Sequence, residues 1–181
     1  MTQRVELATV MDRLGIDELI TEYAVAVDDG DWEAYRGLFT ADGRADYRSA
    51  GGIEGDARQV AAWLAQHMRL FPMRQHLIVN RRVRFGVREQ DIGDTAQVQA
   101  DYVNPMRFAG SDGGPDGSSN GGPDGSSNGG PDGGSGEPDF VCGGRYAFAF
   151  ARTYDGWRLR EVVVQEKWRR MQPAREGNAT P

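Results

Sequence analysis

The hydrophobic period of the chain changes once, near His76, and this change most constrains the fold. Before it, apolar residues recur at the spacing of one helical face: Ile16, Leu19, Ile20, Tyr23, Ala24 and Val27. After it, they alternate at every second position, as in Ala96, Val98, Ala100, Tyr102 and Met106. Helices followed by antiparallel strands are typical of α+β domains, in which helices cover one face of a sheet.

The part before the change predicts three helices. Their buried sides centre on Ile16–Val27, Trp32–Phe39 and Val60–Met68. Asp17 and Asp31 are candidate N-caps, and Gly30 can end the first helix. Phe71-Pro72 ends the third helix, because proline cannot continue one.

The strands come from the rest of the pattern. A turn at Thr40–Gly43 leads into a short strand over Arg44–Ser49. Two hairpins follow, His76–Gly86 with Thr95–Phe108 and Phe140–Thr153 with Trp157–Trp168. We therefore expect an α+β fold with a curved antiparallel sheet packed against three N-terminal helices.

A low-complexity tract separates the two hairpins. Gly113–Asn120 reads GGPDGSSN, and Gly121–Asn128 repeats it without change. Because this composition buries too little apolar surface to offset the entropy of ordering, a disordered loop is predicted at 110–138. A calcium-binding repeat array is the alternative, but it requires aliphatic core positions that the tract lacks.

The same tract carries the net charge of the chain, which is −6. With its flanking residues, over 111–139, it holds six of the 27 acidic residues and no Lys or Arg, so the remainder has 21 acidic and 21 basic residues. A neutral folded part gives no sign of the clustered basic charge that nucleic-acid binding requires.

Cysteine content and hydropathy indicate the cellular compartment in which we expect the protein. The single cysteine, Cys142, precludes an internal disulfide and fits a reducing environment. No stretch resembles a secretory signal or the ~20 apolar residues that cross a bilayer. We expect a cytoplasmic protein without membrane contact, with an extension at 1–13, a domain at 14–170 and a disordered tail at 171–181.

Asp28 and His76 are the first candidates for chemistry. Asp28 lies beside the apolar stripe near the carboxyl end of the first helix, where the helix dipole and partial burial disfavour a carboxylate. His76 opens a strand on the face shared by Ile78 and Asn80. Taken singly, Asp28 is more simply interpreted as a solvated residue at a helix end, and His76 as a polar residue whose hydrogen bonds are satisfied. Taken together, a carboxylate that fixes the tautomer of a histidine makes it a general base.

Phenols and other polar groups complete the predicted site. Tyr23 and Tyr47 are placed to assist a leaving oxygen or to polarise a carbonyl. We expect Tyr102, Asn104, Tyr146 and Phe39 to contact the substrate. The two histidines and the acids lack metal-ligand spacing, so no metal is expected. No phosphate-binding loop is found either, and no cofactor is implied.

Four motifs resemble the SnoaL-like family of the nuclear-transport-factor-2-like superfamily over roughly Leu14 to Arg170, with the tract left out. They are Tyr23-x4-Asp28, Tyr35-x2-Leu38-Phe39-Thr40-x-Asp42-Gly43, Gln75-His76-x3-Asn80 and Asp155-Gly156-Trp157-Arg158. The resemblance implies a cone-shaped fold and an Asp–His pair of the kind used by scytalone dehydratase, bile-acid 7α-dehydratase and a hexachlorocyclohexane dehydrochlorinase.

Asp28 and His76 match that pair, and Tyr47 matches a phenol of scytalone dehydratase. The second active-site histidine of scytalone dehydratase has no obvious counterpart here. Some related dehydratases place an arginine near the final strands, a role for which Arg145 and Arg152 are candidates.

The resemblance favours a cofactor-independent lyase acting on a small, mostly apolar cyclic substrate of polyketide, steroid or terpenoid type. An isomerase or cyclase with the same pair is one alternative, and a non-catalytic ligand-binding or assembly module is another. Related proteins imply a homodimer or homotrimer formed through the sheet. The alternating residues of the last strand are a candidate surface: Arg158, Arg160, Val162, Val164 and Trp168.

Overall fold

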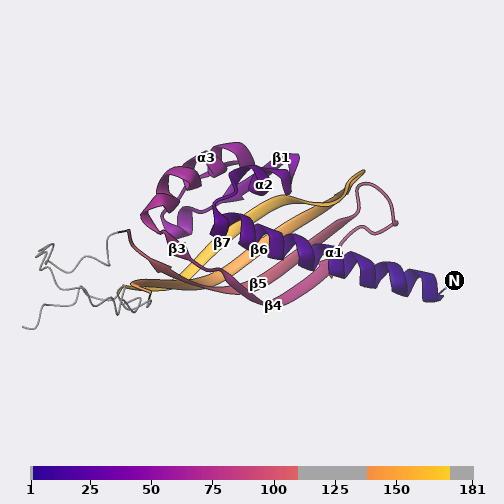
Figure 1. Cartoon of the computed structure of the whole chain (residues 1–181). Coiled ribbons are helices and arrows are strands. Elements are labelled where there is room, and N and C mark those ends of the chain that lie inside the picture. The colour runs from indigo at the N-terminus through magenta and orange to yellow at the C-terminus, as the bar shows by residue number, and fades with distance from the viewer. Residues whose placement is uncertain (1, 110–137, 172–181) are drawn as a thin grey trace, which may run out of the picture.

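The computed structural model describes residues 2–109 and 138–171, in which helices pack against one face of a large curved sheet (Figure 1). The described helices are α1 (Thr2–Asp29), α2 (Trp32–Gly37), α3 (Ala57–His67) and the short 3-10 turns η1 (Arg48–Ala50) and η2 (Met68–Leu70). The strands are β1 (Phe39–Asp46), β2 (Glu54–Asp56), β3 (Met73–Arg74), β4 (Leu77–Phe85), β5 (Thr95–Arg107), β6 (Phe140–Thr153) and β7 (Gly156–Met171). The expected α+β class is confirmed. The predicted disordered loop and tail lie, apart from residues 138 and 171, outside the described residues.

The described strands form a seven-stranded sheet in the order β2-β1-β7-β6-β5-β3, with β4 also paired to β5. All neighbouring pairs are antiparallel except β1 and β7, which run parallel. The sheet is therefore mixed rather than purely antiparallel. The parallel pair joins the first described strand, β1, to the last, β7.

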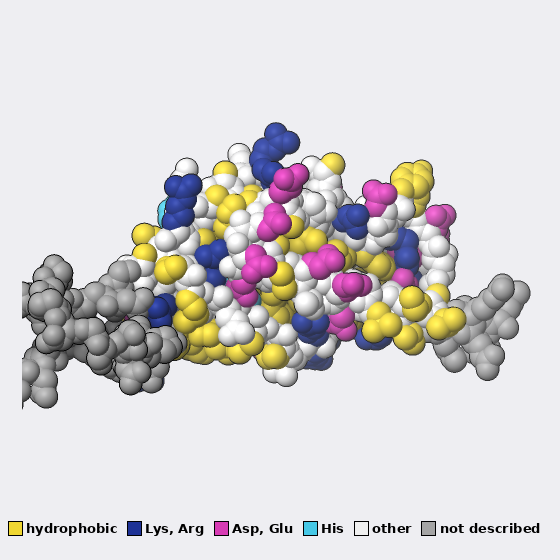
Figure 2. All heavy atoms as spheres, in the orientation of Figure 1, with side chains coloured by type: hydrophobic (Ala, Val, Ile, Leu, Met, Phe, Trp, Pro, Cys, Tyr) yellow, Lys and Arg dark blue, Asp and Glu magenta, His cyan; other side chains and the backbone are white. Residues whose placement is uncertain are grey.

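Helix α1 is longer than the sequence pattern predicts. It begins at Thr2, so the interpretation of Asp17 as an N-cap was wrong. The miss has a physical cause: the first part of α1 leaves its apolar residues in solvent instead of aligning them with the core stripe. These exposed residues, Leu7, Val10, Met11 and Leu14, lie toward the N-terminal end, where apolar side chains gather on the surface (Figure 2).

The end of α1 agrees with the prediction. Gly30 takes a positive φ of 73° just after the helix, a conformation that glycine adopts without strain. Asp31 then caps α2 by accepting a hydrogen bond from the backbone N–H of Ala34 at 2.9 Å. None of the described helices is long and apolar enough to cross a membrane.

The predicted turn at Thr40–Gly43 was wrong, because these residues belong to β1. The register against β7 runs from the pair Phe39–Leu159 to the pair Arg44–Glu161, so the intervening residues form a bulge. A Cβ at Gly43 would lie 2.8 Å from the Cβ of Phe39. Turn-forming residues here therefore mark a bulge inside a strand.

The alternation predicted for β5 and β6 is confirmed. Every second residue of β5 from Ala96 to Tyr102 is buried, and so is Met106. On β6 the buried residues include Phe140, Cys142, Tyr146, Phe148 and Phe150. These side chains cover the concave face of the sheet and make up most of the core under α1.

The single outward surface expected on β7 does not exist. Two register shifts, one at Ala149/Phe150 and one at Gly143/Gly144, each insert an extra residue into β7 and reverse which residues face inward. As a result Val162 and Val164 are buried in the core, whereas Trp168 is half exposed.

Candidate functional site

A cavity of about 380 Å³ lies between the helices and the concave face of the sheet. Its walls come from the end of α1, from η1, α3 and η2, and from β5, β6 and β7. Apolar side chains such as Phe71, Met106 and Phe140 dominate the lining. A largely apolar cavity of this size suits a small ring system, and its few polar groups fix where such a ligand would be held.

Asp28 and His76 meet at this cavity, as the sequence predicts. The Asp28 Oδ1 atom lies 2.6 Å from the His76 Nδ1 atom, and Asp28 Oδ2 accepts the backbone N–H of His76 at 2.7 Å. The side chains are 18% and 7% exposed, respectively. Because the carboxylate can only accept, it places a proton on Nδ1 and leaves Nε2 as the unprotonated nitrogen of the neutral ring.

The chain brings these residues together by clamping the end of α1. Arg74, on β3, donates from Nε to the carbonyl of Val27 at 2.8 Å and from Nη1 to that of Phe71 at 2.8 Å. A cation at the carboxyl end of a helix is favourable, because it satisfies free carbonyls and opposes the dipole. The clamp fixes Asp28, one residue after Val27, beside the segment that carries His76.

Asn104 adds a third polar group. Its Nδ2 atom lies 2.9 Å from His76 Nε2, so in this arrangement the amide donates to the free nitrogen of the ring. Its Oδ1 atom is buried without a hydrogen-bond partner among the described residues. A buried acceptor without a partner is costly, so this oxygen is available to a ligand or to a protonated Nε2.

Asn80 does not share the face of His76, contrary to the prediction. It has a positive φ of 53° at a register shift between Val79 and Arg82, and it donates to Asp101 Oδ2 at 3.2 Å. The bulge breaks the alternation of β4 and turns Asn80 toward solvent.

The predicted phenols lie behind and within the cavity wall. Tyr47 lines the cavity, and its hydroxyl contacts the hydroxyls of Tyr23, by a short hydrogen bond, and of Tyr35 at 3.5 Å. Tyr23 is fully buried and does not line the cavity, so it reaches the site through Tyr47 and through the ring of Tyr146, whose centroid lies 5.6 Å from its own. Burial raises the pKa of the Tyr47 phenol, which keeps it a neutral donor.

Three of the four expected substrate contacts line the cavity: Tyr102, Asn104 and Tyr146. The rings of Tyr102 and Tyr146 lie 4.6 Å apart. Phe39 does not line it. Its ring packs 5.1 Å from that of Tyr35, so we assign Phe39 to the core.

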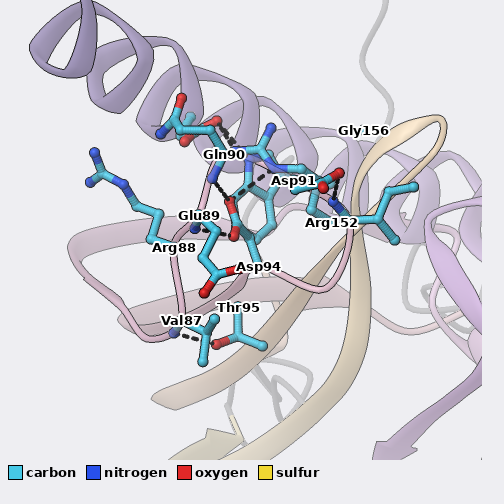
Figure 3. Close-up of polar contacts among 12 residues, drawn as sticks. Val87, Arg88, Glu89, Gln90, Asp91, Asp94, Thr95, Arg152 and Gly156 are labelled. Atoms are coloured by element: carbon cyan, nitrogen blue, oxygen red, sulfur yellow. Dashed lines mark hydrogen bonds and ion pairs between the residues drawn. The ribbon is translucent and has the colours of Figure 1, made fainter. Parts of the chain in front are cut away.

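Neither candidate arginine reaches the cavity. Arg145 pairs with Asp101 at 2.7 Å away from the lining. Arg152 binds Asp12 of α1 at 2.6 Å and Asp94 at 3.3 Å, and it therefore fastens the turn before β5 to the helix (Figure 3). Asp94 in turn accepts the backbone N–H of Glu89 at 2.6 Å (Figure 3). Arg152 is a structural clamp.

The sequence analysis missed three polar residues of the lining: His67, Glu166 and Arg169. His67 stacks on Trp63 at 4.1 Å, and its Nδ1 atom lies 2.8 Å from the carbonyl of Trp63. Its spacing of four residues from Trp63 on the apolar face of α3 was the available signal. Glu166 follows the alternation of the buried Val162 and Val164, and this parity was its available signal. Arg169 had no such signal, because the bulge at Gly143/Gly144 that turns it inward is not encoded in a simple alternation.

Metal-binding groups are a separate question. Across residues 2–109 and 138–171, no group of three or more His, Cys, Asp or Glu side chains is placed to hold a metal ion.

Comparison with known sequences points to one family. The sequence model of the SnoaL-like domain matches residues 8–163. The uncharacterized protein Rv2910c of Mycobacterium tuberculosis is 30% identical over 165 residues, which cover 91% of this chain and 92% of the relative. A protein of Mycobacterium bovis, Mb2934c, is similar to the same extent.

Solved structures share the fold at low sequence identity. A putative scytalone dehydratase from Novosphingobium aromaticivorans aligns with a TM-score of 0.65 and 13% identity, over 98% of this chain and 100% of that chain. A hexachlorocyclohexane dehydrochlorinase, LinA type 2, aligns with a TM-score of 0.68 and 13% identity, over 97% and 98% of the two chains. Kfla4162 from Kribbella flavida aligns with a TM-score of 0.66 and 20% identity, over 90% and 95%.

Proposed function

The chain belongs to the SnoaL-like domain family, and from this membership and the cavity geometry we propose that it is a cofactor-independent lyase of the dehydratase type. The observation that carries the proposal is the two-point contact of Asp28 with His76 at the edge of an apolar cavity. The substrate would be a small, mostly apolar cyclic molecule of polyketide, steroid or terpenoid type, with an acidic C–H next to a carbonyl group.

His76 is the base in this proposal. Its Nε2 atom takes the proton from the carbon beside the carbonyl, and the Asp28 carboxylate stabilises the imidazolium that forms. In the free protein Nε2 accepts from the Asn104 amide, so the substrate must displace this contact. A half-turn of the amide then brings Oδ1, which is buried without a partner among the described residues, to accept from the new Nε2–H.

Tyr47 supplies the neutral donor. Tyr47 lines the cavity, and in this proposal its hydroxyl polarises the substrate carbonyl as negative charge develops on that oxygen. The electron pair of the broken C–H bond forms the new C=C bond, and the leaving hydroxyl departs with the proton held on His76 Nε2. The products are an unsaturated ketone and water, and His76 returns to its neutral state.

The names of two similar structures support an elimination reaction. One is a putative dehydratase and the other a dehydrochlorinase. At 13% identity they show a shared fold, so the activity proposed for this chain rests on its own side chains.

Proton abstraction can be measured without knowing the natural substrate. The probe is 2-tetralone, a two-ring ketone with acidic hydrogens, in deuterated buffer at neutral pH. We expect the wild-type protein to accelerate deuterium incorporation beside the carbonyl, as followed by proton NMR, and His76→Gln to remove the acceleration. An unchanged rate in His76→Gln would refute the assignment of the base.

The two alternatives predict different outcomes. An isomerase or cyclase would catalyse the same exchange, but it would not release water from a β-hydroxy ketone that carries a leaving hydroxyl. A non-catalytic binding module would bind 2-tetralone without accelerating exchange. Mass spectrometry of products from a β-hydroxy ketone of the same ring size separates lyase from isomerase.

A further inference from the structure

Glu166 and Arg169 place a charged pair in the mostly apolar wall of the cavity. Both residues line it, and Glu166 Oε1 accepts a hydrogen bond from Arg169 Nε at 2.5 Å. The Glu166 side chain is only 8% exposed, whereas that of Arg169 is 49% exposed. Ser49 accepts the backbone N–H of Glu166 at 2.9 Å, which fixes this part of β7 against η1.

The pair lies across the floor of the cavity from His76. On successive strands Asn104 is opposite Cys142, and Cys142 is opposite Arg169. Two strand spacings separate the Cα atoms of Asn104 and Arg169 by about 9.5 Å. Because Asn104 contacts His76 Nε2, a two-ring ligand with one end at His76 would have its other end near Arg169.

The space between the two poles is kept open. Tyr102 is opposite Gly144, which is opposite Glu166, and glycine puts no side chain between them. A Cβ at Gly144 would lie 2.1 Å from the carbonyl oxygen of Gln165, so the bulge itself requires glycine. Glu166 follows the alternation of Val162 and Val164 into the cavity, and the bulge after it turns Arg169 inward as well.

The free donor and acceptor sites of Glu166 and Arg169 determine which chemical group of a ligand could bind between them. Among the described residues the Glu166 carboxylate takes one side-chain hydrogen bond, from Arg169 Nε, which leaves acceptor sites on Glu166 and the outer N–H groups of Arg169. A hydroxyl group can donate to the carboxylate and accept from the guanidinium. A carboxylate ligand would be repelled by Glu166, and a hydrocarbon would leave the remaining acceptor sites of Glu166 and the outer N–H groups of Arg169 without a partner in the ligand.

We propose that Glu166 and Arg169 form a subsite for a hydroxyl group at the end of the ring system farthest from the reacting carbon. The substrate class is then a hydroxylated, fused-ring ketone instead of a wholly apolar one. The position of the reacting carbon at His76 rests on the proposed function. The hydroxyl subsite concerns ligand binding alone and is tested by binding.

Three probes differ only at the distal ring position: 2-tetralone, 6-methoxy-2-tetralone and 6-hydroxy-2-tetralone. The methoxy group can accept a hydrogen bond but cannot donate one. Binding is measured at equilibrium by titration calorimetry. We expect the wild-type protein to bind the hydroxy probe about tenfold more tightly than either of the others, as one hydrogen bond to a charged group allows.

Variants of Glu166 and Arg169 test whether these residues cause the preference for the hydroxy probe. Glu166→Gln and Arg169→Gln should each lower the preference for the hydroxy probe to within about threefold. Two matched changes on the same strand, Glu161→Gln and Arg170→Gln, remove one charge of each sign from outside the cavity lining and should leave it unchanged. Melting curves verify that each variant is folded, and Arg169→Lys, which keeps the charge, provides a second test.

The hydroxyl subsite is overturned if the wild-type protein binds the three probes equally or binds none of them. It is also overturned if the preference survives in Glu166→Gln and Arg169→Gln. The same titrations in His76→Gln keep the two proposals apart. A hydroxyl preference without catalysed exchange contradicts only the lyase, and catalysed exchange without the preference contradicts only the subsite.

Discussion

The Asp28 carboxylate holds His76 at two points, with Oδ2 on the backbone N–H at 2.7 Å and Oδ1 on Nδ1 at 2.6 Å. The first contact fixes where the residue enters the cavity wall, and the second fixes which ring nitrogen carries the proton. A single side chain therefore sets both the position and the tautomer of the proposed base.

Replacing Asp28 by asparagine should slow the exchange of 2-tetralone by roughly 10²- to 10⁴-fold, because the imidazolium loses its counter-charge and the tautomer its fixed partner. The rate is measured by proton NMR at neutral pH. Asp29→Asn is the matched control, since Asp29 is the exposed next residue of α1. Equal losses in the two variants would contradict a specific role for Asp28.

Tyr47 and Tyr23 should differ although their hydroxyls touch each other. Tyr47→Phe removes the phenol that lines the cavity, so we expect a loss of about 10²- to 10³-fold in exchange rate. Tyr23→Phe removes a hydroxyl of a residue that does not line the cavity, and its effect should be at least tenfold smaller. If Tyr23→Phe had the larger effect on the exchange rate, Tyr47 would not be the donor to the substrate.

Alkaline pH should destabilise the fold through its buried phenols. Burial raises the pKa of Tyr23, Tyr35, Tyr47 and Tyr146 above the ordinary value. The unfolded chain therefore loses these protons first, above about pH 10, and stability falls with rising pH by about 1.4 kcal/mol per pH unit for each tyrosine. Urea unfolding between pH 8 and 11 measures the slope, and Tyr35→Phe should reduce it. A flat profile above pH 10 would contradict the burial of these phenols.

Cys142 should report on occupancy of the cavity. Burial raises the pKa of its thiol to about 12, so at pH 8 little reactive thiolate is present. We expect slow labelling by iodoacetamide that speeds up about tenfold per pH unit between pH 8 and 9. Because Cys142 lines the cavity, saturating 2-tetralone should slow labelling further. Mass spectrometry follows the reaction. A labelling rate that 2-tetralone does not change would show that 2-tetralone binds outside this cavity.

The sequence predicted those parts of the fold that depend on a repeating pattern. The period of two placed β6 at Phe140–Thr153 and the buried face of β5 correctly, because side chains on a regular strand must alternate. The Asp28–His76 pair was also predictable, since each residue lies beside an apolar pattern and the family resemblance links them.

The errors lie where one extra residue interrupts a pattern. Bulges in β1, β4 and β7 caused the false turn at Thr40–Gly43, the wrong face for Asn80 and the missed inward turn of Arg169. A bulge depends on pairing with a strand far along the chain, so local periodicity carries no trace of it. The assignment of Phe39 to the site has a different cause. Whether an apolar side chain lies in the core or at the cavity depends on tertiary packing, which a single sequence does not specify.

The most direct measurement of the Asp28–His76 arrangement is the tautomer of His76, read from the nitrogen-15 signals of its ring by NMR at a pH where the ring is neutral. The proton should reside on Nδ1 in the wild-type protein, with Nε2 unprotonated. In Asp28→Asn this strict preference should be lost. A wild-type ring that carries its proton on Nε2 would contradict the proposal that His76 is a base facing the cavity.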